Sequence, residues 1–151
     1  MKKFQFPLDT VLDYRRQVQD SLQVELGAVT AEVRRQEETL AAARQRYFEI
    51  NQEYREKKAR GMRIAEVRGY ETALEVQEAV IAGELAKLRK LQKRMEAKRW
   101  ELVSAKQDAS SVEKLREKKF RAYTKDLQKS EEQFIDDLVC ARGGGARNAS
   151  L

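Results

Sequence analysis

The sequence contains no histidine and only one cysteine, and each shortage argues against a class of protein. Without histidine, the commonest general base and metal ligand is missing. Cys140 has no second cysteine with which to form a disulfide, a metal site or a redox pair, so a reducing cytoplasm is the expected compartment. Phosphate-binding glycine motifs are also lacking. We therefore expect no enzymatic activity, no metal and no cofactor.

Long hydrophobic runs are absent as well. Aromatic residues make up 7% of the chain and charged residues 37%, which argues against a thick globular core. No apolar stretch approaches the roughly 20 residues of a membrane span. The basic start Met1-Lys2-Lys3 is followed by no apolar segment, so a secretory signal is not expected.

What the sequence does contain is typical of long helices. Alanine, glutamate, lysine, arginine and leucine together make up more than half of the chain. Pro7 is the only proline, so no proline interrupts a helix after it. No alternating run rich in β-branched residues is bounded by turn residues. The composition predicts an all-α protein.

Apolar residues recur in alternating steps of four and three, which is the spacing of a coiled-coil seam. In the first half of the chain the seam consists of Leu22, Leu26, Val29, Val33, Gln36, Leu40, Ala43, Tyr47, Ile50 and Tyr54. Gln36 is its one polar residue. Upstream we expect it to continue, with a one-residue phase slip, through Val18, Arg15, Val11 and Leu8.

The seam resumes after Gly61, a suitable C-cap that follows a basic last turn. Its expected positions are Val67, Tyr70, Leu74, Gln77, Ile81, Glu84, Leu88, Leu91, Met95, Lys98, Leu102, Ala105, Ala109 and Val112. Two long amphipathic helices with one short connection predict an antiparallel two-helix coiled-coil hairpin with a longer second helix. We expect helices over about residues 8–59 and 65–139, a turn at 60–64, a single rod over 1–140 and a flexible tail at 141–151.

The register of the hairpin follows from its turn. If residues 59 and 64 face each other, Leu8 lies opposite about residue 115, near the end of the clean heptad. Residues 116–140 should then form an overhang without a partner helix. Its apolar stripe consists of Phe120, Tyr123, Leu127, Phe134 and Leu138. Such a stripe predicts either a partner-binding surface, self-association, or contact with Phe4 and Phe6 folded back onto its start.

Two further features lie outside the seam. Trp100 should occupy the outer face of the second helix, either over neighbouring arginine side chains or as a contact anchor. Residues 87–99 contain seven basic residues and one acidic residue, and residues 114–129 contain seven and two. These clusters predict either a solvated helix exterior or electrostatic docking to an acidic protein surface, and less readily to nucleic acid.

The two ends of the sequence resemble the FliJ family of flagellar type III export proteins. The start FQFPLDTVLDYRR matches the family pattern at Phe4, Phe6, Leu8, Val11, Leu12 and Arg15. The far end is similar in EKLREKKFRAY (Glu113, Lys114, Leu115, Glu117, Lys118) and in EEQFIDDL (Glu132, Gln133, Asp136). A tyrosine-centred stretch at Tyr70 and Leu74 is also similar to the family.

This resemblance implies a non-enzymatic stalk or adaptor at the cytoplasmic face of the inner membrane, at the flagellar base. The implied partners are the hexameric flagellar export ATPase, the membrane export-gate protein and export chaperones, with no nucleic acid expected. The implied ATPase-ring residues are Phe4, Phe6, Arg15, Arg116, Lys118, Lys119, Phe120 and Tyr123. The implied gate-binding residues are Tyr70, Ala73, Gln77, Val80 and Glu84, and Trp100, Leu127 and Phe134 are further contact candidates.

Three alternative functions remain open from the sequence. The closest is the stalk protein of a virulence-type secretion system. The others are a basic coiled coil that binds nucleic acid, with a steep salt dependence, and a self-assembling coiled-coil scaffold.

Overall fold

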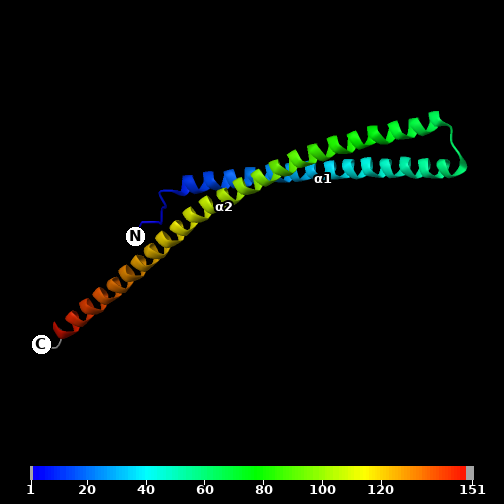
Figure 1. Ribbon diagram of the computed structural model, residues 1–151. Coiled ribbons are helices and arrows are strands. Elements are labelled where there is room, and N and C mark those ends of the chain that lie inside the picture. The colour runs from blue at the N-terminus through cyan, green and yellow to red at the C-terminus, as the bar shows by residue number, and fades with distance from the viewer. Residues whose placement is uncertain (1, 149–151) are drawn as a thin grey trace. The chain divides into compact units, whose positions relative to one another are not determined.

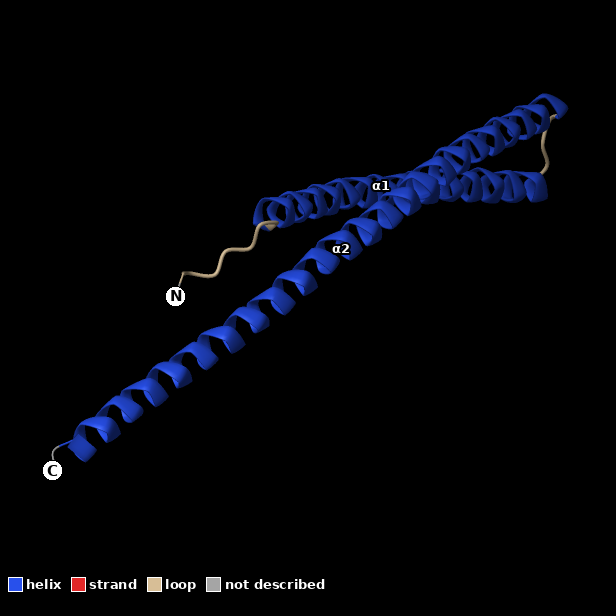
Figure 2. Cartoon of the chain, turned by 90° about the vertical axis from the view of Figure 1, so that its left-hand side faces the viewer, coloured by secondary structure: helices blue, strands red, loops and turns tan. Residues whose placement is uncertain are grey.

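The computed structural model describes residues 2–148, within which there are two α-helices and no strand. Helix α1 spans Asp9–Arg60 and helix α2 spans Ile64–Asn148, joined by the short connection visible in Figure 1. Figure 2 shows the same two helices by secondary structure. The predicted all-α hairpin with a longer second helix is therefore confirmed.

The turn begins at the glycine cap predicted from the sequence. The last turn of α1 contains Lys57, Lys58 and Arg60, whose positive charges interact favourably with the negative end of the helix dipole. Gly61 has a φ of 96°, and its N–H donates to the Lys58 carbonyl at 3.3 Å. A backbone in this left-handed region favours glycine because a side chain would be strained there.

This cap gives a first prediction. Gly61→Ala should lower the free energy of unfolding by about 1 kcal/mol, because alanine is strained at a positive φ. Gly83→Ala is the matched control: Gly83 lies within α2, and an added Cβ would meet nothing within 4 Å. It should raise the free energy of unfolding by roughly 0.5–1 kcal/mol. Urea titration of both variants checks this, and effects of the same sign would contradict it.

Contacts divide the chain into two compact units. Asp20–Ser104 forms one, which we call the hairpin unit. Met1–Gln19 together with Ala105–Leu151 forms the other, which we call the terminal unit. Each unit contains a segment of α1 packed against a segment of α2. The expectation of a single rod over residues 1–140 stays a prediction.

The core of the hairpin unit lies along the predicted seam. Val33, Leu40 and Leu88 form a buried cluster, against which pack Ile81, Leu85, Leu91 and Met95. The seam positions expected in both helices of this unit are buried or half-buried, and the polar exceptions Gln36, Gln77, Glu84 and Lys98 are half-buried as well. The period of the sequence therefore predicted the packed face of each helix.

Long-range polar contacts confirm the predicted register within each unit. In the hairpin unit, Lys98 Nζ lies 2.8 Å from Glu25 Oε2, and the Tyr70 hydroxyl donates to Glu53 Oε1 at 2.9 Å. In the terminal unit, Arg116 Nε lies 3.2 Å from Asp9 Oδ1, as expected if Leu8 faces about residue 115.

The predicted start of the seam is wrong at Val11 and Leu8, whereas Arg15 and Val18 are half-buried as expected. Val11 is 40% exposed and Leu8 is exposed too, whereas Leu12 is buried to 2% exposure. The heptad continues without a phase slip from Leu22 through Gln19 and Arg15 to Leu12, and both polar residues are half-buried. Long polar side chains can occupy seam positions because their stems pack while their heads reach the rim. The Arg15 guanidinium does so, lying 3.3 Å from Asp108.

The far end of α2 also differs from its expected boundary. The helix continues to Asn148, whereas the sequence suggested an end near residue 139. A helix adds one backbone hydrogen bond for each residue it gains, and each glycine costs only about 1 kcal/mol relative to alanine. Flexibility of residues 141–148 stays a prediction, and residues 149–151 lie outside the described residues.

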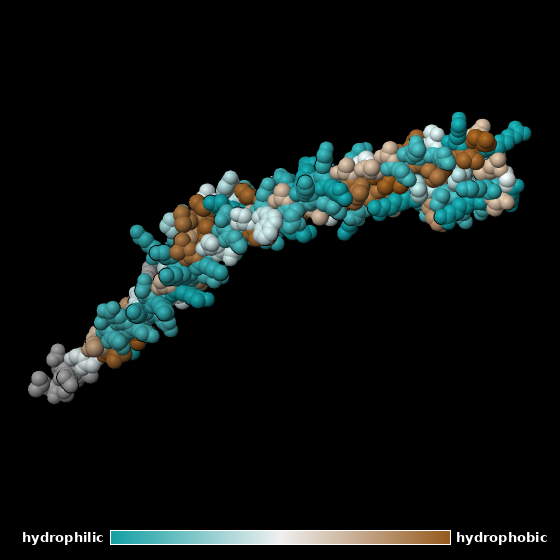
Figure 3. Space-filling view, in the orientation of Figure 1, coloured by the Kyte–Doolittle hydropathy of each residue, from teal (hydrophilic) through white to brown (hydrophobic). Residues whose placement is uncertain are grey.

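The face of the molecule seen in Figure 3 is mostly hydrophilic, with separate hydrophobic patches. Trp100 is 66% exposed, so its predicted place on the outer face of α2 is confirmed. Residues 128–144 are all exposed, as expected for a helix segment without a partner.

Candidate functional site

Three aromatic rings meet in the terminal unit. The Phe4 ring centroid lies 5.2 Å from that of Phe120, edge to face, and 5.5 Å from that of Tyr123. The Phe120 and Tyr123 rings are stacked at 6.4 Å. We call Phe4, Phe120 and Tyr123 the aromatic cluster. Its members come from the segment before α1 and from consecutive turns of α2, so it forms only when the chain folds.

Polar contacts fix the aromatic cluster in place. The Tyr123 hydroxyl donates to the Lys2 carbonyl oxygen at 2.8 Å. Arg116 donates to Asp9 and also places its guanidinium carbon 5.7 Å from the Phe4 ring centroid. A guanidinium at this distance attracts the face of an aromatic ring. Arg116 therefore joins the start of α1, the segment before it and α2.

Phe6 has a different position from Phe4. It is only 5% exposed and belongs to the buried residues of the terminal unit, as does Leu12. The backbone turns here, since the Asp9 N–H donates to the Phe6 carbonyl at 3.1 Å. The predicted contact of this segment with the start of the apolar stripe therefore occurs through Phe4, whereas Phe6 fills the core.

The remaining residues of the predicted ring-binding set lie apart from the cluster. Arg15 is engaged with Asp108. Lys118 and Lys119 are exposed. Lys118 lies about 200° around α2 from Phe120, hence on the opposite side of the helix. The structure thus brings together Phe4, Arg116, Phe120 and Tyr123, but not Lys118.

A second apolar surface follows along α2. Leu127 is half-buried, and Phe134 is 65% exposed. These two residues line a shallow hollow together with Ser130, Glu131 and Ile135. The sequence stripe missed Ile135, although its position one residue after Phe134 widens the same apolar side of the helix. Exposed apolar residues gathered in this way are typical of an interaction surface.

The predicted gate-binding residues divide into inward and outward positions. Inward, Gln77 Nε2 donates to the Ala43 carbonyl at 2.9 Å, and Tyr70 packs its ring 5.4 Å from that of Tyr54. Ala73 is half-buried and shares a small cavity with Tyr70. Of the five residues, only Val80 is exposed, at 43%.

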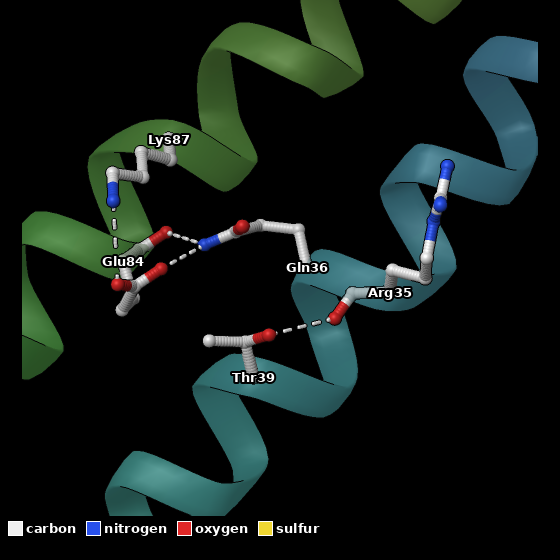
Figure 4. Close-up of polar contacts among 5 residues, drawn as sticks. All are labelled: Arg35, Gln36, Thr39, Glu84 and Lys87. Atoms are coloured by element: carbon white, nitrogen blue, oxygen red, sulfur yellow. Dashed lines mark hydrogen bonds and ion pairs between the residues drawn. The ribbon is translucent and has the colours of Figure 1, made fainter.

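Glu84, the fifth member of that set, belongs to a polar layer between the helices of the hairpin unit. Figure 4 shows Gln36 of α1 reaching across to Glu84 of α2, where its amide donates to both the carboxylate and, at 3.0 Å, the backbone carbonyl. Lys87 approaches the same carboxylate. The hydrogen bond from Gln36, followed by the charge of Lys87, lowers the pKa of Glu84. Such a layer disfavours other registers because a shift would leave half-buried polar groups unpaired.

Hydrogen bonds and neighbouring charges also shift the pKa values of Glu53 and Lys98. The Tyr70 hydroxyl and then Lys57 lower the pKa of Glu53. Glu25 and then Glu101 raise the pKa of Lys98. Each shift favours the charged form. These groups therefore stabilise the pairing of α1 and α2 rather than forming a site of acid–base chemistry.

Among the described residues, no group of three or more histidine, cysteine, aspartate or glutamate side chains could hold a metal ion. Cys140 is an exposed free thiol. No helix in the described part of the chain is both long and apolar enough to cross a membrane.

The fold and the site together define a helical hairpin that presents a cluster of aromatic and basic side chains, a type of surface that proteins use to bind other proteins. A family model described as "Flagellar FliJ protein" matches residues 4–147. The chain therefore belongs to the FliJ family, and it is a flagellar-type, export-related protein. Neither curated proteins nor solved structures give a match.

Proposed function

We propose that this chain is a non-enzymatic stalk or adaptor of the flagellar type III protein export apparatus. In this proposal it binds the hexameric export ATPase, promotes assembly and activity of the ATPase ring, and couples the ring to the membrane export gate. It acts in the cytoplasm and at the cytoplasmic face of the inner membrane. Family membership supports the flagellar export system over the virulence-type system.

The aromatic cluster is the observation that supports ring binding most strongly. Phe4, Phe120 and Tyr123 stay accessible, with Phe120 49% exposed, although they are held by contacts with one another and by the Lys2 carbonyl. Rigid aromatic side chains beside an arginine are the commonest anchors of protein interfaces because little conformational entropy is lost when they bind. Leu127 and Phe134 extend this surface along α2.

The gate contact is proposed for the outer face of the hairpin unit. Because Tyr70, Gln77 and Glu84 are occupied between the helices, we assign this contact to Val80 together with exposed Val76, one helical turn before it. Two exposed valines at this spacing form an apolar contact surface. Export chaperones are further proposed partners, and no binding of nucleic acid is expected.

The direct test is ATP hydrolysis by the cognate export ATPase, measured with and without this protein across a series of salt concentrations. We expect stimulation, and co-sedimentation of the protein in a complex of ring size. Stimulation should persist at salt concentrations that screen exposed charges, because contacts made by aromatic side chains do not depend on charge. No stimulation and no complex at any salt would refute the proposal, and a steep salt-dependent affinity for RNA or DNA would favour the nucleic-acid alternative.

A further inference from the structure

A row of basic side chains runs along α2 in the terminal unit. Its residues follow one another in steps of four, three, four and four: Lys114, Lys118, Arg121, Lys125 and Lys129. At 100° per residue they fall on one side of the helix, within a sector of about 80°. At 1.5 Å per residue the row is about 22 Å long. We call these five residues the basic ridge.

The ridge forms no ion pair among the described residues. Three other arginines of the same unit have carboxylate partners: Arg16 lies 3.0 Å from Glu113, and Arg15 and Arg116 are paired as well. None of the five ridge residues has a carboxylate oxygen within 4.0 Å among the side chains that the structure describes, and all five are exposed. The ridge is therefore a positively charged surface available to a partner.

The opposite side of α2 is occupied. Ala109 is buried against the α1 side, and Phe120 and Tyr123 contact the segment before α1. These residues lie roughly 120–240° around the helix from the ridge. Packing within the terminal unit thus closes one side of α2 and leaves the ridge facing outward.

We propose that the basic ridge docks the protein on an anionic lipid surface. A single straight row of long cationic side chains on one helix can reach a flat layer of phosphate headgroups simultaneously. Clusters of four to eight lysines and arginines on a helix are attracted to anionic lipids, by roughly fivefold in partition for each charge. The ridge contains no aromatic side chain on which a base could stack, which disfavours single-stranded nucleic acid as the occupant.

The charge of the ridge ends abruptly. Glu132 and Asp136 lie on the same side of α2, one and two turns beyond Lys129. Their carboxylates repel anionic headgroups and so limit the contact to residues 114–129. Because of this boundary, substitutions can either remove charge from the ridge or extend it past Lys129. A gain of binding on extension would indicate a binding surface, because a variant that only disturbs the fold would not bind more tightly.

The test uses the full chain and sedimentation with vesicles of phosphatidylcholine alone or mixed with phosphatidylglycerol; no ATPase is present, so its outcome is independent of the proposed ring binding. We expect binding to the mixed vesicles only, and weaker binding as salt rises. Lys118→Glu, Arg121→Glu and Lys125→Glu combined should lower the partition coefficient by about 100-fold or more, since roughly fivefold is lost for each charge even before repulsion.

A charge-matched control reverses Arg89, Lys90 and Lys93, which are exposed basic residues of the hairpin unit. It makes the same change in net charge and should retain most of the binding. Conversely, Glu132→Lys with Asp136→Lys should strengthen binding about tenfold or more, a gain that misfolding could not produce. Equal losses in both reversed variants, no gain in the lengthened variant, or tighter binding to a single-stranded oligonucleotide than to vesicles would each overturn the proposal.

Discussion

Replacing Leu40 with alanine should lower the free energy of unfolding by about 2–4 kcal/mol. Leu40 is buried with Val33 and Leu88 in the cluster that joins α1 to α2 in the hairpin unit. The substitution removes apolar contact from both helices and leaves a cavity that the surrounding side chains fill only in part. A urea titration followed by far-ultraviolet circular dichroism measures the change directly.

The control for this variant is Val24→Ala in the same unit. Val24 is 74% exposed, so its truncation should change the free energy of unfolding by no more than about 0.5 kcal/mol. Comparable losses in the two variants would show that the helix pair is not stabilised by the Leu40 cluster. A large loss in Leu40→Ala alone would identify the seam as the main source of stability.

The sequence was sufficient to predict the two helices, their register and, within the hairpin unit, their packed faces. A two-helix hairpin has one interface, and the heptad period specifies which residues face it. The cap at Gly61 then determines how the helices are aligned, because the turn leaves few choices of pairing. Contacts such as Glu25 with Lys98 and Asp9 with Arg116 follow from that alignment.

The start of the seam was mispredicted because an apolar residue was preferred to its polar neighbour: Val18 was chosen in place of Gln19, and Val11 then followed in place of Leu12. Arg15 belongs to both series and is half-buried, as is Gln19. The choice of Val18 came at the cost of a phase slip. A rule that accepts long polar residues in the seam, as at Gln36, would have led to Leu12.

One contact that holds the candidate site could not be predicted. Tyr123 bonds to the Lys2 backbone carbonyl, and every residue has such a carbonyl, so no residue type signals this acceptor. The sequence identified the aromatic rings, but only the path of the segment before α1 shows that Phe4 joins the aromatic cluster and that Phe6 is buried.

Replacing both Phe120 and Tyr123 with alanine should leave the helix content unchanged and strongly weaken stimulation of the export ATPase. Both residues are on the surface of α2, where alanine is a good helix former. Loss of an aromatic anchor at an interface costs about 2 kcal/mol or more, which corresponds to roughly 30-fold in affinity. The concentration of this protein that gives half-maximal stimulation should therefore rise by at least about 30-fold.

Two further variants separate the possible causes of that loss. Phe48→Ala removes an exposed aromatic residue from the hairpin unit and should leave stimulation unchanged, so an equal effect would contradict a site at the aromatic cluster. Tyr123→Phe keeps the ring but removes the hydroxyl that bonds to the Lys2 carbonyl. If the rings themselves contact the ATPase, Tyr123→Phe should retain most of the stimulation. If Tyr123→Phe is as defective as the double variant, then stimulation of the ATPase requires the hydrogen bond from Tyr123 that holds the segment before α1. A double variant that loses helix content would instead assign Phe120 and Tyr123 a structural role.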